Sequence, residues 1–181
     1  IVFGDWSSDV CSSDLNFEGL ISDRLITSDK NPILFNHEAV TDELNRGYPP
    51  VLCLANNHTL DLPEYFDSTL EILTSKGISF CGAGKSVYEA SKPVFFDEGK
   101  GQVLLFNACW NFLLYNHSNP SKGVYVAEIN EARILHAVRE QKNLNRNASI
   151  VVFLHWSFDL EILPFPMYRQ FSRDLIDAGA N

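Results

Sequence analysis

The sequence of 181 residues predicts an α/β domain, because short apolar runs typical of buried strands alternate with stretches of helical periodicity. Four runs are expected to form strands, at residues 1–4, 51–54, 103–106 and 150–154. They are rich in β-forming residues and bounded by polar ones, which suits strands that are buried on both faces. The length is enough for one substantial core, so a single domain is expected over residues 1–181.

Three helices are expected between these strands, over residues 63–76, 131–145 and 167–178. Pro63 suits the first turn of the first helix, and Gly77 and Gly179 suit the ends of the first and third. Apolar residues recur at helical spacing in each: Phe66, Leu70 and Leu73 in the first, Ile134, Leu135 and Val138 in the second, and Phe171, Leu175 and Ile176 in the third. Residues 107–125 mix polar and aromatic side chains, which predicts a loop at the surface or rim.

Composition excludes several classes of protein. With 45% hydrophobic and 20% charged residues the chain is not intrinsically disordered. No apolar run approaches the roughly 20 residues that cross a bilayer. The net charge of −9 argues against nucleic-acid binding, which needs clustered Lys and Arg, although an acidic protein can bind an anionic substrate where a metal supplies positive charge.

The four cysteines form no C-x-x-C pair, which argues against a zinc ribbon or a thioredoxin-like site. Cys53, Cys81 and Cys109 lie in or beside apolar runs, so we expect buried thiols. The stretch GAGKS at 82–86 ends like a phosphate-binding loop, but Ser79 stands where that motif requires glycine. A turn before residues 87–90 is the expected structure.

Residues 7–15, SSDVCSSDL, repeat the tripeptide Ser-Ser-Asp on either side of Val10 and Cys11. One reading is a polar loop with a helix N-cap signal. The segment also resembles a translated sequencing adapter, and we interpret it so. Asp9, Cys11 and Asp14 are therefore given no functional weight.

Polar residues follow several of the expected strands, where ligands gather in α/β sheets. Asp5 follows residues 1–4, Asn16 and Glu18 occur in the tripeptide NFE, and His155 and Trp156 follow residues 150–154. The run 51–54 leads directly into Asn56, Asn57 and His58. Carboxylates, a carboxamide and an imidazole suit Mn²⁺, Fe²⁺ or Zn²⁺ better than a structural thiolate zinc site.

Each of these residues also has a simpler interpretation. Asp5 suits a turn or cap, His155 suits a packed position at the rim, and an Asn-Asn-His run suits a turn because asparagine tolerates left-handed conformations. Asp61 is expected to cap the helix that begins near Pro63, in preference to binding a metal. Spacing alone therefore supports a candidate metal site and nothing more specific.

Longer motifs occur in a characteristic order: NFEGLIS, LANNHTLDLPEYFDSTLEIL, GISFCGAGKSVYEASKPV and LHWSFDLEILPFPMYRQFSRDLIDAGAN. Together they resemble the CapA family of bacterial capsule and poly-γ-glutamate synthesis proteins, over residues 16–181, with GDW at 4–6 matching the opening of the family. That family is similar in fold to calcineurin-like metallophosphoesterases. The resemblance implies a metallophosphoesterase-like α/β sandwich, with layered sheets flanked by helices.

The resemblance also implies roles for the residues at the strand ends. His58 would be the general acid that protonates the leaving group, a role that suits an imidazole. One or two divalent ions (Mn, Fe or Zn) would be held by the predicted ligands Asp5, Glu18, Asn57 and His155, with Glu18 as the bridging carboxylate. The predicted substrate-binding or supporting residues are Asn16, Asn56 and Trp156, with Asn16 steadying Glu18 or the substrate.

The implied function is metal-dependent hydrolysis of a phosphoester or similar ester, linked to assembly of an anionic capsule polymer, in the cytoplasm or at the cell envelope. Membrane proteins of capsule assembly are the expected partners. The alternative is a polymer-binding or scaffold protein without catalysis, which the aromatic residues Trp110, Phe112, Tyr115 and Tyr125 would serve, although packing is the preferred role for them.

Two features depart from the family pattern. Ser157 stands where the family has the glycine of an HWG motif, and the family's G-H-x-x-H element would follow Asn181. The missing end element, together with the adapter-like segment near the start, leads us to expect a domain that is truncated at both ends.

Overall fold

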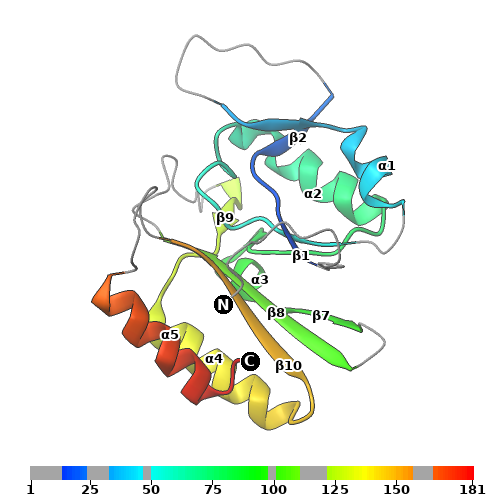
Figure 1. Ribbon diagram of the computed structural model, residues 1–181. Helices are drawn as coiled ribbons and strands as arrows, with labels where there is room; N and C mark the ends of the chain where they lie inside the picture. The colour runs from blue at the N-terminus through cyan, green and yellow to red at the C-terminus, as the bar shows by residue number, and fades with distance from the viewer. Residues whose placement is uncertain (1–13, 24–32, 47–49, 98–100, 111–121, 157–164) are drawn as a thin grey trace.

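The computed structural model describes residues 14–23, 33–46, 50–97, 101–110, 122–156 and 165–181 (Figure 1). The strand expected at residues 1–4 and the predicted ligand Asp5 lie outside these ranges. So do residues 7–13 of the adapter-like segment, whose last two residues, Asp14 and Leu15, belong to the first strand.

Two three-stranded sheets form the centre of the fold. The first has the order β1 (Asp14–Asn16), β4 (Val51–Cys53) and β5 (Phe80–Cys81), and its strands are parallel. The second has the order β10 (Ser149–His155), β8 (Gln102–Cys109) and β7 (Val94–Asp97), in which β8 runs parallel to β10 and antiparallel to β7. The strands predicted at 51–54, 103–106 and 150–154 are therefore confirmed.

Two pairs of very short strands complete the β structure. One pair is parallel, β2 (Leu20–Ser22) with β3 (Phe35–His37), and the other is antiparallel, β6 (Ala83–Gly84) with β9 (Tyr125–Val126). The loop predicted over residues 107–125 is wrong at both ends, because β8 continues to Cys109 and β9 begins at Tyr125. The Cys109 N–H donates to the Ala127 carbonyl at 2.8 Å, so these two ends of the segment hold each other.

The three predicted helices are confirmed as α2 (Phe66–Ser75), preceded by a 3₁₀ turn at Pro63–Tyr65, α4 (Glu131–Leu144) and α5 (Pro166–Ala178). Gly77 and Gly179 follow α2 and α5 with φ angles of +69° and +115°, the left-handed conformation that favours glycine at a helix end. Ile176, grouped with Phe171 and Leu175 by helical spacing, is 57% exposed, unlike those two buried residues. It follows the buried Leu175 by one residue, which turns it about 100° around the helix axis.

Two shorter helices, α1 (Val40–Leu44) and α3 (Val87–Ser91), were not predicted as such. The expected turn before residues 87–90 is confirmed, because α3 begins directly after GAGKS. The Ser86 hydroxyl caps α3 by accepting from the Glu89 N–H at 3.1 Å, and the Glu89 carboxylate accepts from the Lys85 N–H at 2.8 Å.

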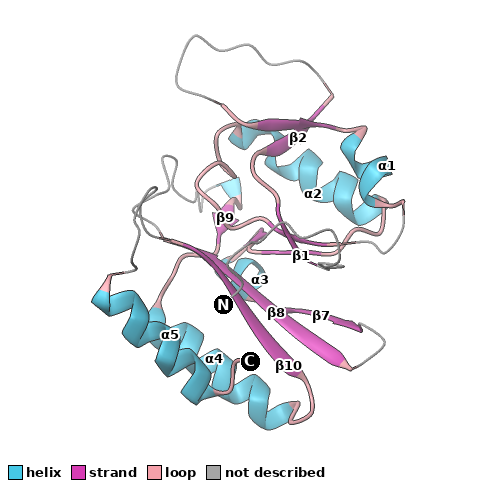
Figure 2. Cartoon of the chain, in the orientation of Figure 1, coloured by secondary structure: helices cyan, strands magenta, loops and turns pink. Residues whose placement is uncertain are grey.

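The fold is layered (Figures 1 and 2), and alternating side chains of its strands pack on opposite faces. In β4, Leu52 packs in the cluster that contains α2, whereas Val51 and Cys53 pack against Leu105 of β8. Leu104 and Phe106, which flank Leu105, point to the opposite face and pack in the cluster that contains α4 and α5. The two sheets therefore face each other, with α2 on one outer side and α4 and α5 on the other.

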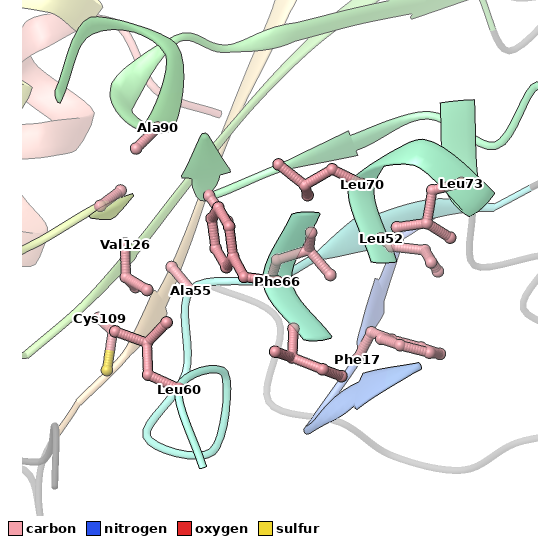
Figure 3. Close-up of a cluster of buried hydrophobic side chains, with 14 of the residues drawn as sticks. Phe17, Leu52, Ala55, Leu60, Phe66, Leu70, Leu73, Ala90, Cys109 and Val126 are labelled. Atoms are coloured by element: carbon pink, nitrogen blue, oxygen red, sulfur yellow. The ribbon is translucent and has the colours of Figure 1, made fainter. Parts of the chain in front are cut away.

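The α/β class is confirmed, while the metallophosphoesterase type of sandwich remains a prediction. Figure 3 shows Phe66 in the middle of the labelled side chains of the cluster around α2. Of the helices within the described residues, none has the length and apolar character needed to cross a membrane.

Candidate functional site

Strands β1 and β4 end side by side. Asn16 pairs with Cys53 in the parallel register, and the Phe17 N–H donates to the Cys53 carbonyl at 3.1 Å. Because parallel strands end at the same edge of a sheet, Glu18 and the Asn56–His58 run leave the sheet together. This edge brings two of the predicted polar sets into one region.

Asn56 is fully buried and shapes the loop after β4. Its side-chain amide donates to the Phe17 carbonyl at 2.9 Å, and its Oδ1 accepts from the His58 N–H and the Thr59 hydroxyl, each at 3.1 Å. An asparagine that bonds the backbone two residues ahead forms an Asx turn. Asn56 therefore supports the loop from inside.

Asn16 holds the carboxylate of Glu18. Its side-chain amide donates to Glu18 Oε1 at 2.9 Å, and its own oxygen lies 3.5 Å from the Asn56 amide nitrogen. The contact expected between Asn16 and Glu18 is thus present in the structure. A chain of amides leads from the loop after β4 to the Glu18 carboxylate.

Asn57 differs from Asn56 in its surroundings. It is only half-buried, and within the part of the chain that the structure describes its carboxamide makes no hydrogen bond. The adjacent asparagine uses both ends of its amide for folding. The geometry therefore leaves the Asn57 carboxamide available to a ligand, as its predicted role requires.

His58 and Asp61 form a close, mostly buried pair. His58 Nδ1 lies 2.8 Å from Asp61 Oδ2, and the two side chains are 17% and 8% exposed. The same aspartate oxygen accepts from the Leu34 N–H at 3.1 Å. Because an ionised carboxylate can only accept, Nδ1 carries the hydrogen in this pair.

The prediction that Asp61 caps the following helix is wrong. The residue at the N-cap of the 3₁₀ turn is Leu62, and no side chain caps that turn. The carboxylate turns back to His58 and Leu34 because a residue three positions after the histidine lies beside it in this tight loop. Sequence alone does not distinguish the two roles, since aspartate suits both.

His155 is the last residue of β10 and pairs in register with Cys109 at the end of β8. Its carbonyl accepts from the Trp110 N–H at 2.9 Å. The ring of the next residue, Trp156, packs on Tyr168 with ring centroids 4.6 Å apart, and on Phe171 at 5.9 Å. Trp156 thus anchors the backbone beside His155 to α5.

Cys109 connects the strand end at His155 with the carboxylates. Its thiol is fully buried. Cys53 and Cys81 are also buried, with at most 2% of each residue exposed, so the buried thiols expected from the sequence are confirmed. Burial first, and then the negative charges of Glu128 and Glu18, raise the pKa of Cys109 to about 12. Glu18 therefore lies within electrostatic reach of the residue that pairs with His155.

Glu128 was not predicted as part of this region. It is exposed and joins Cys109 through an isolated parallel bridge, so the chain that follows β9 returns to the same edge. No motif or strand-end position marks Glu128 in the sequence. Only the fold places its charge here.

The raised pKa of Cys109 predicts a loss of stability at alkaline pH. The unfolded thiol loses its proton above about pH 8.5, whereas the folded thiol keeps it up to about pH 12, so each rise in pH across this window favours the unfolded chain. Cys109→Ala should therefore flatten the fall of Tm between pH 8.5 and 11, measured by differential scanning fluorimetry. Equal slopes in the two proteins would contradict this account of Cys109.

The structure thus brings Asn16, Glu18, Asn56, Asn57 and His58 to one edge, and places Glu18 within reach of the strand pair that ends at His155. Asp5 lies outside the described residues. In the part of the chain that the structure describes, no three His, Cys, Asp or Glu side chains form a group that could hold a metal. Glu18 and His155 are the two predicted ligands of these types within that part, since Asn57 is an amide.

Comparison with known proteins gives one family. A family model described as bacterial capsule synthesis protein PGA_cap matches residues 7–181. No curated protein matches the sequence.

Proposed function

Because this chain belongs to the PGA_cap family of bacterial capsule synthesis proteins, we propose that it is a metal-dependent hydrolase domain that cleaves a phosphoester or similar ester during capsule assembly. The observation that carries the proposal is the loop after β4, where the His58–Asp61 pair stands directly beside an Asn57 carboxamide without a protein partner among the described residues. A buried acid–base pair next to a ligand donor suits hydrolysis.

The donors in this region fit a divalent cation. Asn16 donates to one oxygen of the Glu18 carboxylate and so fixes the orientation of the group. The other oxygen would bind the ion. Glu18, Asn57 and His155 would hold the metal, together with Asp5. These oxygen and nitrogen donors are those that Mn²⁺, Fe²⁺ and Zn²⁺ accept, and the cation would activate water and offset the charge of an anionic substrate.

His58 would act as the general acid. Asp61 holds Nδ1 and so fixes the plane of the ring, and Nε2 would deliver the proton to the leaving-group oxygen. The Leu34 N–H bonds the same aspartate oxygen and restrains it. Asp61 is thus a positioning residue for the catalytic histidine.

Asp61→Asn tests the pair. The asparagine side chain can donate as well as accept a hydrogen bond, so the variant would no longer require the hydrogen of the His58 ring to lie on Nδ1. We expect kcat for an aryl phosphate with Mn²⁺ to fall about 10- to 100-fold, as when an orienting partner is lost. The double variant with His58→Ala should be no slower than His58→Ala alone, because Asp61 acts through the ring. Additive losses would show that Asp61 acts independently of His58.

Metal content tests the function as a whole. The full-length protein from an uninterrupted reading frame should purify with a transition metal, or gain one on dialysis, and should hydrolyse the aryl phosphate only when metal is present. A protein that neither holds nor gains metal would favour the polymer-binding or scaffold role. Of the aromatic residues that served that alternative, Trp110 packs edge-on against Tyr168 and Tyr125 packs against the cluster around α2, whereas Phe112 and Tyr115 lie outside the described residues.

A further inference from the structure

We propose that Asn107 is a positioning residue that holds the strand end carrying Asn57 and His58 in place against the strand end carrying His155. This role rests on the proposed function, since it concerns the ligands of the proposed metal site. Neither the motifs in the sequence nor the family match assigns a role to Asn107.

Asn107 lies in β8 and makes contacts to both sheets. Its Oδ1 accepts from the Ala55 N–H at 2.6 Å, and its side-chain amide donates to the Phe153 carbonyl at 3.3 Å. Ala55 precedes Asn57 by two residues in the loop after β4, and Phe153 precedes His155 by two residues in β10. One side chain therefore links the two segments that carry the predicted ligands.

The residue type fits this task. Asn107 is 5% exposed within a strand whose other residues from Val103 to Cys109 are apolar and buried, so its polar atoms must find partners inside the protein. A carboxamide offers one acceptor and two donors in a single plane, which matches an N–H on one side and a carbonyl on the other. An apolar residue would leave the Ala55 N–H without its acceptor.

Gly82 makes room for this link. A Cβ at residue 82 would collide with Asn107 Oδ1 and would lie 2.6 Å from the Ala55 nitrogen. Gly82 also has a φ angle of +91°, which L side chains rarely adopt. A side chain is thus excluded at the point where the Asn107 carboxamide meets the loop after β4.

The link matters for function because metal ligands on different strands must be held within about 0.5 Å of their working geometry. His58 and Asp61 lie on the same loop and can keep their contact without Asn107. Glu18, Asn57 and His155 come from three strand ends, so their mutual placement depends on links between strands. Loss of Asn107 should therefore weaken metal binding more than it disturbs the acid–base pair.

Asn107→Ala tests the proposal in the full-length protein. We expect the Mn²⁺ affinity, measured by calorimetric titration, to fall about 10- to 100-fold, as for losses of residues that orient metal ligands. In the metal-free protein the Ala55 amide should exchange its hydrogen faster than in the wild type, measured by NMR. Thr41→Val is the matched control, because it removes a buried hydroxyl that donates to the Glu38 carbonyl at 2.8 Å at the start of α1. It should leave Mn²⁺ affinity unchanged.

The outcomes separate this role from the proposed function. If the wild-type protein and Asn107→Ala bind Mn²⁺ with equal affinity, the role of Asn107 is overturned and the proposed hydrolase function is not affected. A wild-type protein that binds no Mn²⁺ overturns both. If Asn107→Ala does not fold, Asn107→Ser replaces it, because a hydroxyl is too short to reach both partners, and the same loss of affinity is expected.

Discussion

Replacing His58 with alanine is expected to lower kcat of the Mn²⁺-loaded full-length protein by about 10²- to 10⁴-fold, the usual contribution of a general acid. The histidine lies 2.8 Å from Asp61 in a mostly buried pair, so the substitution would remove the proposed proton donor from a position that solvent does not readily reach. Turnover of an aryl phosphate measures the effect, with Mn²⁺ affinity measured in parallel. Because Asn57 and Glu18 remain, the affinity should change little.

His136→Ala is the matched control for this substitution, because His136 is an exposed histidine on α4. It should retain wild-type turnover. Metal-dependent turnover that persists unchanged in His58→Ala would rule out the assigned role. A leaving group of low pKa gives a second comparison, because an ester that needs no protonation should lose much less activity in the variant.

Phe66→Ala should destabilise the protein by about 3–5 kcal/mol, the range for deleting a large aromatic side chain from a core. Phe66 has no exposed surface and lies among the side chains of the cluster around α2 (Figure 3). Urea unfolding followed by circular dichroism measures the loss. Tyr88→Ala serves as the control, since Tyr88 is 76% exposed and its removal should change stability by less than about 0.5 kcal/mol. A loss below about 1 kcal/mol at Phe66 would contradict this packing.

The long elements could be predicted because their signals are local. Runs such as Val103–Phe106 are apolar without interruption, and α2 carries Phe66, Leu70 and Leu73 at helical spacing together with Gly77 at its end. The pairs β2–β3 and β6–β9 could not be predicted. Strands of two or three residues are too short for any periodicity to appear, and they exist only because a distant segment pairs with them.

The site divides in the same way. The family resemblance implied the contact between Asn16 and Glu18. The strand-end rule placed Glu18 and the Asn56–His58 run at one edge. That rule did not reveal that Asn56 is buried and hydrogen-bonded while Asn57 is half-buried without a hydrogen bond among the described residues, because the two neighbours have identical side chains. Asn107 did leave a signal, since it is a polar residue within an otherwise apolar strand.

The Leu34 N–H that bonds Asp61 has a practical consequence for anyone who exchanges parts between members of this family. The orientation of His58 depends on Asp61, and Asp61 in turn bonds the main chain 27 residues before it, so a graft of the Asn56–Asp61 loop alone would lose this contact. A chimera should move the loop and the segment around Leu34 as one module. Residue 34 of such a design must keep its peptide N–H, which excludes proline at that position.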